Sequence, residues 1–466
     1  MVGPGQAIGS NAVAESVAVH GFWTRSRKAG VVYLVLGAFA ALVFGVATGA
    51  GETARFTLSV RTNGAGVDLP ARPFAIAFGA VCALVGLILL AERFATWLVR
   101  GRVRAFGARI LRVLARWRVL RAAGRAAAWV GRLRHRFGLM TAIAIVTFVL
   151  SFLCWQIAGD FLPVVGLAQQ TLFLAVPLIL GSLAGVLGER SGGINVAIEG
   201  QLLMGAFCGA LFGSIAASAW VGLFAAAVGG LAVGAILAVL AIRYLVDQVV
   251  LGVVLNVFAM GITGYLYDRF MQPNTEAYNN PPIFGEIRIP LLADIPVLGP
   301  VLFDNTVITY LAIVLVIVVS LALSRTRWGL RTRAVGEHPS AADTVGIRVR
   351  LVRYRNVLIG GAIAGIGGAA LTVGSVGQFG KDMSNGRGFI ALAALIFGRW
   401  SPTGALAGAL LFGFADALQS NLSSFNSVIP SQFLTMLPYV ATILAVAGLV
   451  GKVRAPAADG QPYVKG

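Results

Sequence analysis

Long apolar stretches alternate with short polar segments along almost the whole sequence. A helix needs about 17 to 25 mostly apolar residues to cross the hydrocarbon layer of a membrane, and stretches of this length recur throughout. The pattern predicts an all-α polytopic membrane protein with about ten core transmembrane helices and about two extra helices before them. The predicted spans are residues 31–50, 74–91, 139–158, 171–188, 194–214, 219–242, 249–266, 308–324, 355–374, 388–400, 403–420 and 434–450.

The composition supports this class. Hydrophobic residues make up 58% of the 466 residues and charged residues only 12%, about half the charged share of a soluble domain. The net charge of +19 would suggest nucleic-acid binding in a soluble chain. Here the arginines gather in a few loops, as in cytoplasmic loops of membrane proteins, and no aromatic-interleaved basic motif is present. We therefore expect the chain to lie in a membrane and to bind no nucleic acid.

The charges of the loops predict an orientation. Residues 92–137 contain thirteen arginines and one acid, and residues 325–355 contain eight arginines and two acids. Residues 267–307 contain two arginines against five acids. Positively charged loops stay on the cytoplasmic side, so the first two loops are predicted inside and the third outside. The even number of spans then places both termini in the cytoplasm.

The predicted spans divide the sequence into three parts. Residues 1–138 form an N-terminal extension with two spans and an arginine-rich amphipathic segment, suited to the anionic inner leaflet or to a partner protein. Residues 139–451 hold the other spans, and residues 452–466 form a cytoplasmic tail. Small residues four apart, such as Gly361 and Gly365, predict close packing of helices; sliding of helices during transport is the functional alternative.

The sequence gives no support for metal or enzyme chemistry. Its three cysteines and three histidines are not spaced like metal ligands, so we expect no metal site. No Ser/His or His/Asp constellation suggests a membrane enzyme. The phosphate-loop pattern G-x-x-x-x-G-K-[ST] is absent, so we expect a chain that neither hydrolyses ATP nor carries a cofactor.

A few polar side chains interrupt the predicted spans. An ionised group facing lipid at mid-membrane costs about 2.5–3.5 kcal/mol, so these side chains should face the interior of the bundle. Asn195 and Glu199 are four residues apart, which predicts one helical face. They are candidates for contact with a solute in passing, or for hydrogen bonds between helices. The further candidates for the translocation path are Asn256, Asp416 and Gln378.

Two other polar features have alternative explanations. Glu189 and Arg190 lie near the predicted inner end of a span, where we expect interface anchors or a salt bridge. Gln378 belongs to a polar, glycine-rich break at residues 374–388. Such a break lines a cavity when it lies at membrane depth, and otherwise it is a plain exterior loop.

The basic loop at residues 325–355 contains a predicted short helix from Pro339 to Val345. Ser340 is a plausible cap for this helix, and Gly346 ends it. A helix of two turns has little to bury by itself. It either docks into a pocket of another protein or is a chance helical turn in an ordinary basic loop.

The segment GLRTRAVGEHPSAADTVGI (329–347) resembles the coupling loop of permease subunits of ATP-binding cassette (ABC) importers. The shared pattern is G-L-x-x-R-A-V-G-E-x-P-x-A-A-x-x-x-G-I. The resemblance implies that the short helix seats in a cleft of a separate ATPase subunit, which uses the ATP. The residues that the pattern assigns to this contact are Glu337, Ala341, Ala342 and Gly346.

Two further segments extend the resemblance. These are GERSGGINVAIEGQLLMGAF (188–207) and NGRGFIALAALIFGRWSPTGALAGALLFGFADALQ (385–419). Both are similar to segments of the branched-chain amino acid, ribose and nucleoside permease family, in its guanosine-type branch that works with a lipoprotein. Sugar-importing relatives have Asp at the position of Asn195. The resemblance covers about residues 139–451 and does not reach residues 1–138.

The resemblance implies a nucleoside importer permease in a bacterial cell membrane, without enzymatic activity of its own. It also implies three partners: an ABC ATPase, a second and unlike permease in a heterodimer, and an extracellular lipoprotein that binds the solute. A simple-sugar importer of the ribose type is the alternative. An ion-coupled secondary transporter that uses Glu199 and Asp416 is less favoured, because it would leave the coupling loop unexplained.

Overall fold

The computed structural model describes residues 25–57, 66–90, 137–423, 436 and 454–465. The chain separates into two compact units, which we call the N-terminal unit (residues 1–56 and 66–162) and the core unit (residues 57–65 and 163–466). In the described part of the chain, nine helices are long and apolar enough to cross a membrane. The predicted all-α, multi-pass membrane class is therefore confirmed.

The N-terminal unit combines three membrane-length helical segments with a small sheet of strand order β2-β1-β3. The first segment passes from α2 through a π-helical turn into α3, and α4 packs against both α2 and α8. The short strands were not predicted. The elements are α2 (Arg25–Phe39), η1 (Ala40–Phe44), α3 (Gly45–Ala47), β1 (Thr53–Thr57), β2 (Gly66–Pro70), α4 (Ala71–Leu90), α8 (Phe137–Gln156) and β3 (Phe161–Pro163).

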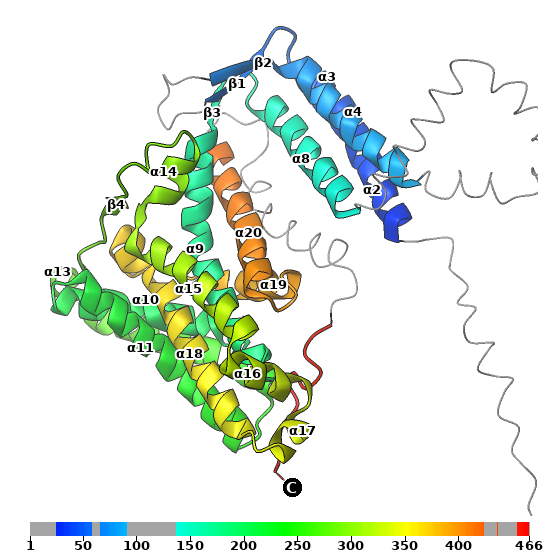
Figure 1. Cartoon of the computed structure of the whole chain (residues 1–466). Helices are drawn as coiled ribbons and strands as arrows, with labels where there is room; N and C mark the ends of the chain where they lie inside the picture. The colour runs from blue at the N-terminus through cyan, green and yellow to red at the C-terminus, as the bar shows by residue number, and fades with distance from the viewer. Residues whose placement is uncertain (1–24, 58–65, 91–136, 424–435, 437–453, 466) are drawn as a thin grey trace, which may run out of the picture. The chain divides into compact units, whose positions relative to one another are not determined.

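The core unit is a bundle of long helices with short elements at its ends (Figure 1). A two-stranded antiparallel ladder pairs β4 with β5. The elements are α9 (Val164–Glu189), α10 (Ile198–Ile215), α11 (Ala219–Ala238), η3 (Val239–Arg243), α12 (Gln248–Leu266), η4 (Tyr267–Met271), α13 (Thr275–Tyr278), β4 (Glu286–Arg288), α14 (Leu298–Phe303), β5 (Asp304–Thr306), α15 (Val307–Arg325), α16 (Arg327–Glu337), α17 (Pro339–Thr344), α18 (Val349–Ala369), η5 (Thr372–Val376), α19 (Arg387–Phe397) and α20 (Pro402–Ser423).

Most predicted spans coincide with helices, but some boundaries were wrong. The span predicted at 194–214 begins only at Ile198, in α10. The loop predicted at 325–355 folds into α16, α17 and the first turns of α18. The segment predicted as a short span at 388–400 is helical as α19, but with 11 residues it is not among the helices long enough to cross a membrane. The span at 434–450 and the basic segment at 92–137 lie almost wholly outside the described residues.

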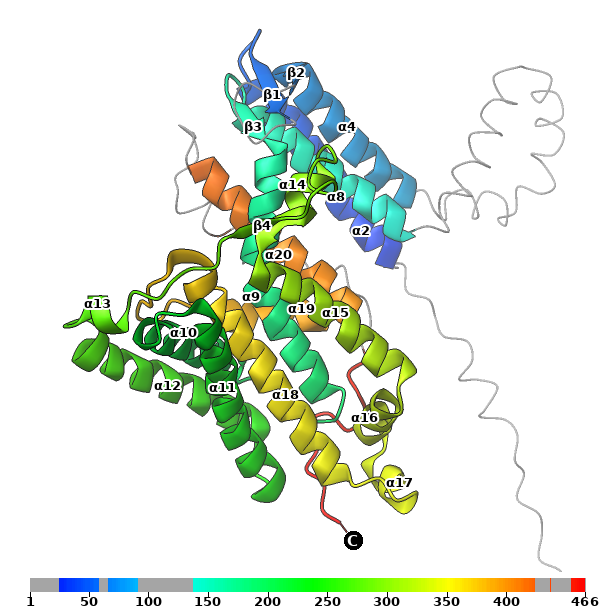
Figure 2. The same cartoon turned by 60° about the vertical axis from the view of Figure 1, so that its left-hand side comes forward.

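Helix α9 is the centre of the core unit and is buried over most of its length. The largest apolar cluster joins α9 to α15, α18, α19 and α20. Helix α18 also runs alongside α10 and α11, which can be followed in Figure 1 and Figure 2. Helices α16 and α17 lie at one end of α18.

Glycines bring α11 and α18 into backbone contact. A Cβ atom on Gly365 would lie 2.1 Å from the carbonyl oxygen of Ala226, and one on Gly230 would lie 2.3 Å from the carbonyl oxygen of Gly361. The predicted close packing at these small residues is confirmed. In lipid, where apolar burial gives no preference for one partner over another, such close contact supplies the attraction between helices.

Replacing Gly365 by alanine should destabilise the bundle, because the new methyl group has no space beside Ala226 and overpacking costs about 1–3 kcal/mol. The thermal unfolding midpoint in detergent measures the effect. Gly261 on α12 is the matched control, because no heavy atom lies within 4 Å of an added Cβ there. Equal midpoints for the two variants would contradict the proposed role of the contact.

Candidate functional site

Several residues singled out in the sequence lie in or beside the break between α9 and α10 (residues 190–197). Gly192 turns the chain at a φ of +83°, a conformation that costs other residues about 1–2 kcal/mol. Asn195 lies in this break and precedes the first residue of α10. The prediction that Asn195 and Glu199 share one face of a helix is therefore wrong, although both side chains are buried.

Glu189 and Arg190 fasten the end of α9 to the turn after α19. The Trp400 indole Nε1 donates a hydrogen bond to Glu189, and Arg190 Nε donates one to the Trp400 carbonyl over 2.6 Å. Glu189 is only 3% exposed. The prediction of an interface anchor is wrong for Glu189, because its carboxylate is enclosed by the chain.

Asn195 pairs with a residue that the sequence analysis missed. Its Nδ2 donates to Gln201 Oε1 over 3.1 Å, and both side chains are fully buried. In the part of the chain that the structure describes, Asn195 Oδ1 and Gln201 Nε2 have no hydrogen-bond partner. The pair therefore retains one acceptor and one donor inside the bundle.

Glu199 holds the first turn of α19. Its Oε1 accepts hydrogen bonds from Ser384 Oγ at 2.6 Å and from the Gly386 N–H at 2.8 Å. Its Oε2 accepts one from the Gly388 N–H at 2.5 Å. The first N–H groups of a helix have no partner within the helix, and a carboxylate also suits the positive end of the helix dipole. Of the two predicted roles, the geometry fits the hydrogen bond between helices.

Asn256 does the same for α10. Its Oδ1 accepts from the Gly200 N–H at 2.8 Å, and its Nδ2 donates to the Val196 carbonyl at 2.9 Å. Both ends of the amide are thus used to fix the α9–α10 break against α12. The first residue of that helix, Gln248, accepts from the Ile194 N–H on the same break.

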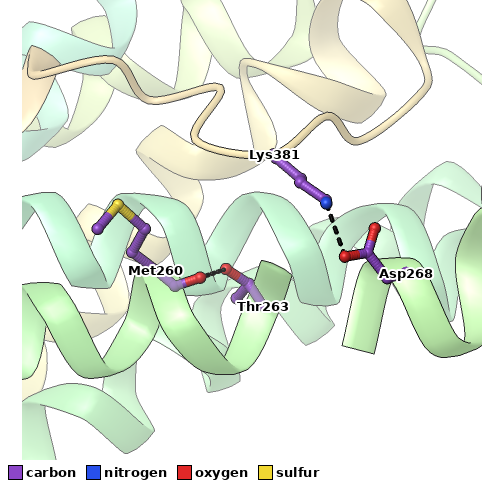
Figure 3. A network of polar contacts seen from close by, with 4 residues as sticks. All are labelled: Met260, Thr263, Asp268 and Lys381. Carbon is purple, nitrogen blue, oxygen red and sulfur yellow. Dashed lines mark hydrogen bonds and ion pairs between the residues drawn. The ribbon is translucent and has the colours of Figure 1, made fainter. Parts of the chain in front are cut away.

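The break between η5 and α19 (residues 377–386) is bound to the bundle through its backbone. Asn279 donates to the Phe379 carbonyl and accepts from the Phe379 N–H, at 3.0 and 2.7 Å. Figure 3 shows Lys381 of this break beside Asp268 of η4, with 2.6 Å between Nζ and Oδ2. Both side chains of this ion pair are about half exposed, so it contributes at most about 1 kcal/mol. The buried backbone bonds therefore hold the break.

The two remaining path candidates are Gln378 and Asp416. Gln378 is exposed on the η5–α19 break, as expected of an exterior loop. Asp416 is half-buried in α20 and interacts electrostatically with Arg387, the first residue of α19. Among the described residues, no hydrogen bond joins any two of the five predicted path residues.

The coupling segment folds as α16 and α17. The short helix is confirmed, but it runs from Pro339 to Thr344. Its N-cap residue is His338, so the prediction of Ser340 as its cap is wrong. Gly346 follows it at a φ of +83°, as expected of a helix-ending glycine. Helix α16 was not predicted, although the buried Thr332 and Val335 are three residues apart, a spacing typical of a helix.

The four predicted contact residues differ in exposure. Glu337, Ala341 and Gly346 are exposed, but Ala342 is only 3% exposed and lies in an apolar cluster with Val335 and Val349. The side chain of Val345, which the pattern did not assign, is 75% exposed. The exposed surface at this end of the chain therefore includes Ala341 of α17 and Val345 and Gly346, which directly follow the helix.

The core unit also matches known proteins in sequence. A family model described as "Branched-chain amino acid transport system / permease component" matches residues 167–448. The guanosine ABC transporter permease protein NupQ of Bacillus subtilis is 42% identical over 309 residues, which are 64% of this chain and 97% of the relative.

Two further relatives cover the same part. The nucleoside ABC transporter permease protein NupC of Lactococcus lactis subsp. cremoris is 39% identical over 64% of this chain and 96% of its own length. The putative glucose ABC transporter permease protein TsgC13 of Haloferax volcanii is 33% identical over 60% of this chain and 91% of its own length. No solved structure matches the chain.

Replacing Glu199 by alanine should lower stability, because it leaves a buried N–H group, a partly buried N–H group and a buried hydroxyl without an acceptor, at about 1–3 kcal/mol for each buried group. The unfolding midpoint in detergent and the yield of folded protein measure this loss without any solute. Glu276, an exposed acid on α13, is the control for removal of a carboxylate. Normal stability combined with lost transport would instead place Glu199 on the solute path.

Proposed function

The chain belongs to the family of branched-chain amino acid transport system permease components, and from this premise we propose that it is the membrane-spanning subunit of an ABC importer for nucleosides. The observation that carries the proposal is the similarity to two relatives named as guanosine and nucleoside permeases, each matched over nearly its whole length. The core unit contains both breaks and the coupling segment, so it holds every feature on which the function depends.

The partner that hydrolyses ATP is a separate ATPase subunit, and α17 is its docking helix. The exposed surface of this helix supports the assignment. Val345 is a large apolar side chain at 75% exposure, beside the exposed Ala341 and Gly346. An exposed apolar side chain at the end of a short helix suits a pocket in a partner. Glu337 contributes its charge at the end of α16, and Ala342 acts indirectly by packing α17 against the bundle.

The solute path is best supported at Asn195 and Gln201. Glu199 and Asn256 use their side-chain atoms to hold helix ends. The Asn195–Gln201 pair keeps a free acceptor and a free donor, which is the chemistry that a nucleoside base or a ribose hydroxyl can match. A movement of the adjacent break would bring the pair into contact with a passing solute.

The complete importer contains further subunits. We expect a second, unlike permease to form a heterodimer with this chain and an extracellular lipoprotein to deliver the solute. The orientation from the basic loops places both termini and α17 in the cytoplasm of a bacterial cell. The η5–α19 break, with its exposed Gln378 and Lys381, then lies toward the outer side, where the lipoprotein would bind.

A simple sugar is the second candidate solute, because one relative is named as a putative glucose permease. Its lower identity and the Asn at position 195 favour a nucleoside. A ribose unit is common to nucleosides and to the sugar alternative, so competition assays must include both classes.

Replacing Val345 by aspartate should weaken binding of the ATPase subunit by about tenfold or more, since loss of an interface hot spot costs at least about 1–2 kcal/mol. Co-purification of the ATPase with the inserted permease is the measurement. Leu330 on α16 is also exposed, at 62%, and Leu330→Asp is the matched control. Equal losses in both variants would mean that α17 is not the centre of the docking surface.

Replacing Asn195 or Gln201 by leucine should reduce uptake of radiolabelled guanosine about tenfold, the effect of losing one buried hydrogen bond. Protein level and ATPase binding should stay unchanged. Ser182→Ala is the control, because this buried hydroxyl already donates to Ile179 within α9. Uptake in cells with the complete importer should be blocked by unlabelled nucleosides. If glucose or ribose inhibits uptake and nucleosides do not, the solute is a sugar and not a nucleoside.

A further inference from the structure

Residues 454–465, here called the tail segment, lie across the end of the core unit that carries α16 and α17 (Figure 1). The Ala458 N–H donates to the Gly336 carbonyl at 2.8 Å, and the Ala457 N–H donates to Glu337 Oε2 at 3.3 Å. Gly336 and Glu337 are the last residues of α16, directly before the docking helix. The tail segment is therefore hydrogen-bonded to the base of the coupling region.

The same segment fits closely against the α9–α10 break. A Cβ atom on Gly192 would lie 2.9 Å from the Ala458 carbonyl oxygen, and one on Gly460 would lie 2.6 Å from the side chain of Ile194. Both glycines have a positive φ. The tail segment therefore packs closely on the break, with a backbone contact at Gly192 and a side-chain contact at Gly460.

Arg353 joins the tail segment, the break and α18. This arginine is only 3% exposed. Its Nε donates to the Ser191 carbonyl at 3.2 Å on the break, and its Nη1 donates to the Gln461 carbonyl at 2.8 Å on the tail segment. Burying a guanidinium costs several kcal/mol unless it is paired, so Arg353 depends on both neighbours for its hydrogen bonds.

Asp459 supplies a charge of opposite sign beside this arginine. Burial raises the pKa of Asp459 to about 7, against the lowering effects of the Gly460 N–H and of Arg353. Asp459 also lies close enough to the Glu189 carboxylate for the two to interact. The tail segment thus brings its own acidic group into the environment of Arg353.

Tyr463 covers the inner side of the docking helix. Its ring packs against the apolar cluster of Val335, Ala342 and Val349, and its hydroxyl interacts electrostatically with the Asp343 carboxylate. Helix α17 has only six residues, which is too short to be stable alone in water. Its orientation therefore depends on what packs beneath it, and Tyr463 is part of that support.

We propose that the tail segment is a latch that holds the ATPase-docking helix α17 to the α9–α10 break, with Arg353 as the positioning residue that joins them. The latch makes one mechanical unit of the docking helix and the break that carries Asn195. Movement of the ATPase would then reach the solute path through the tail segment as well as through α18. The transport role of the latch rests on the proposed function, whereas its geometry does not.

The geometry is tested by labelling a cysteine placed beneath Tyr463. In a full-length chain whose three native cysteines are replaced by alanine, Ala342→Cys should react slowly with a water-soluble maleimide in inside-out vesicles. A stop codon in place of Arg454 should raise the labelling rate several-fold, and so should Arg353→Gln. Arg355→Gln, an exposed arginine on the same helix, should leave the rate unchanged. An unchanged rate after removal of the tail segment would overturn the latch.

The coupling role is tested in proteoliposomes that contain the complete importer. Removal of the tail segment and Arg353→Gln should each lower the solute imported per ATP hydrolysed by about fivefold or more, in the range of typical coupling free energies. ATPase binding should be retained. The double variant should be no worse than either single one, because both changes break the same contact. Additive losses, or an unchanged ratio, would contradict the latch.

The two experiments separate failure of the latch from failure of the proposed function. If the unaltered chain gives no ATP-dependent uptake but the labelling results hold, the proposed function is wrong and the latch geometry is right. If uptake depends on ATP but neither the labelling rate nor the import ratio changes, the proposed function is right and the latch is wrong.

Discussion

The core unit depends on satisfying the backbone of two helices that begin inside the bundle. Helices α10 and α19 both start after breaks in the helical backbone, and the first N–H groups of each have no partner within the helix. At membrane depth, non-helical backbone is tolerated only where other protein groups satisfy it. Glu199 supplies acceptors to α19 and Asn256 supplies one to α10. These two side chains therefore help to fix the position of both breaks.

This constraint explains why charges gather in a highly apolar chain. The charged segment that begins at Glu189 includes two acids, and both are held in hydrogen bonds to distant parts of the fold. Burying each acid costs free energy. Hydrogen bonds from N–H and O–H donors that would otherwise lack an acceptor offset this cost. The acids thus fix the geometry of the breaks, while the neighbouring Asn195 and Gln201 retain the groups suited to recognition of a solute.

The end of the bundle that carries α17 follows the same principle. A six-residue helix gains its position from what it packs against, and here this support comes from α16, α18 and the tail segment. The buried Arg353 takes its hydrogen bonds from two segments that are far apart in the sequence. Close glycine contacts between α11 and α18 give the bundle the rigidity that transmission of movement needs.

Local patterns in the sequence were sufficient for several features. They determined the membrane class, most spans, the short α19, the helix α17 with its end at Gly346, and the small-residue packing, because each depends on residues within a few turns of one another. The hydrogen-bond partners of the buried polar groups could not be predicted from such local patterns. Ser384 lies 185 positions after Glu199, and Gln461 lies 108 positions after Arg353. Only the tertiary structure decided that Asn195 precedes α10, that Glu189 is enclosed and that Ala342 is covered, because burial depends on which distant segments pack together.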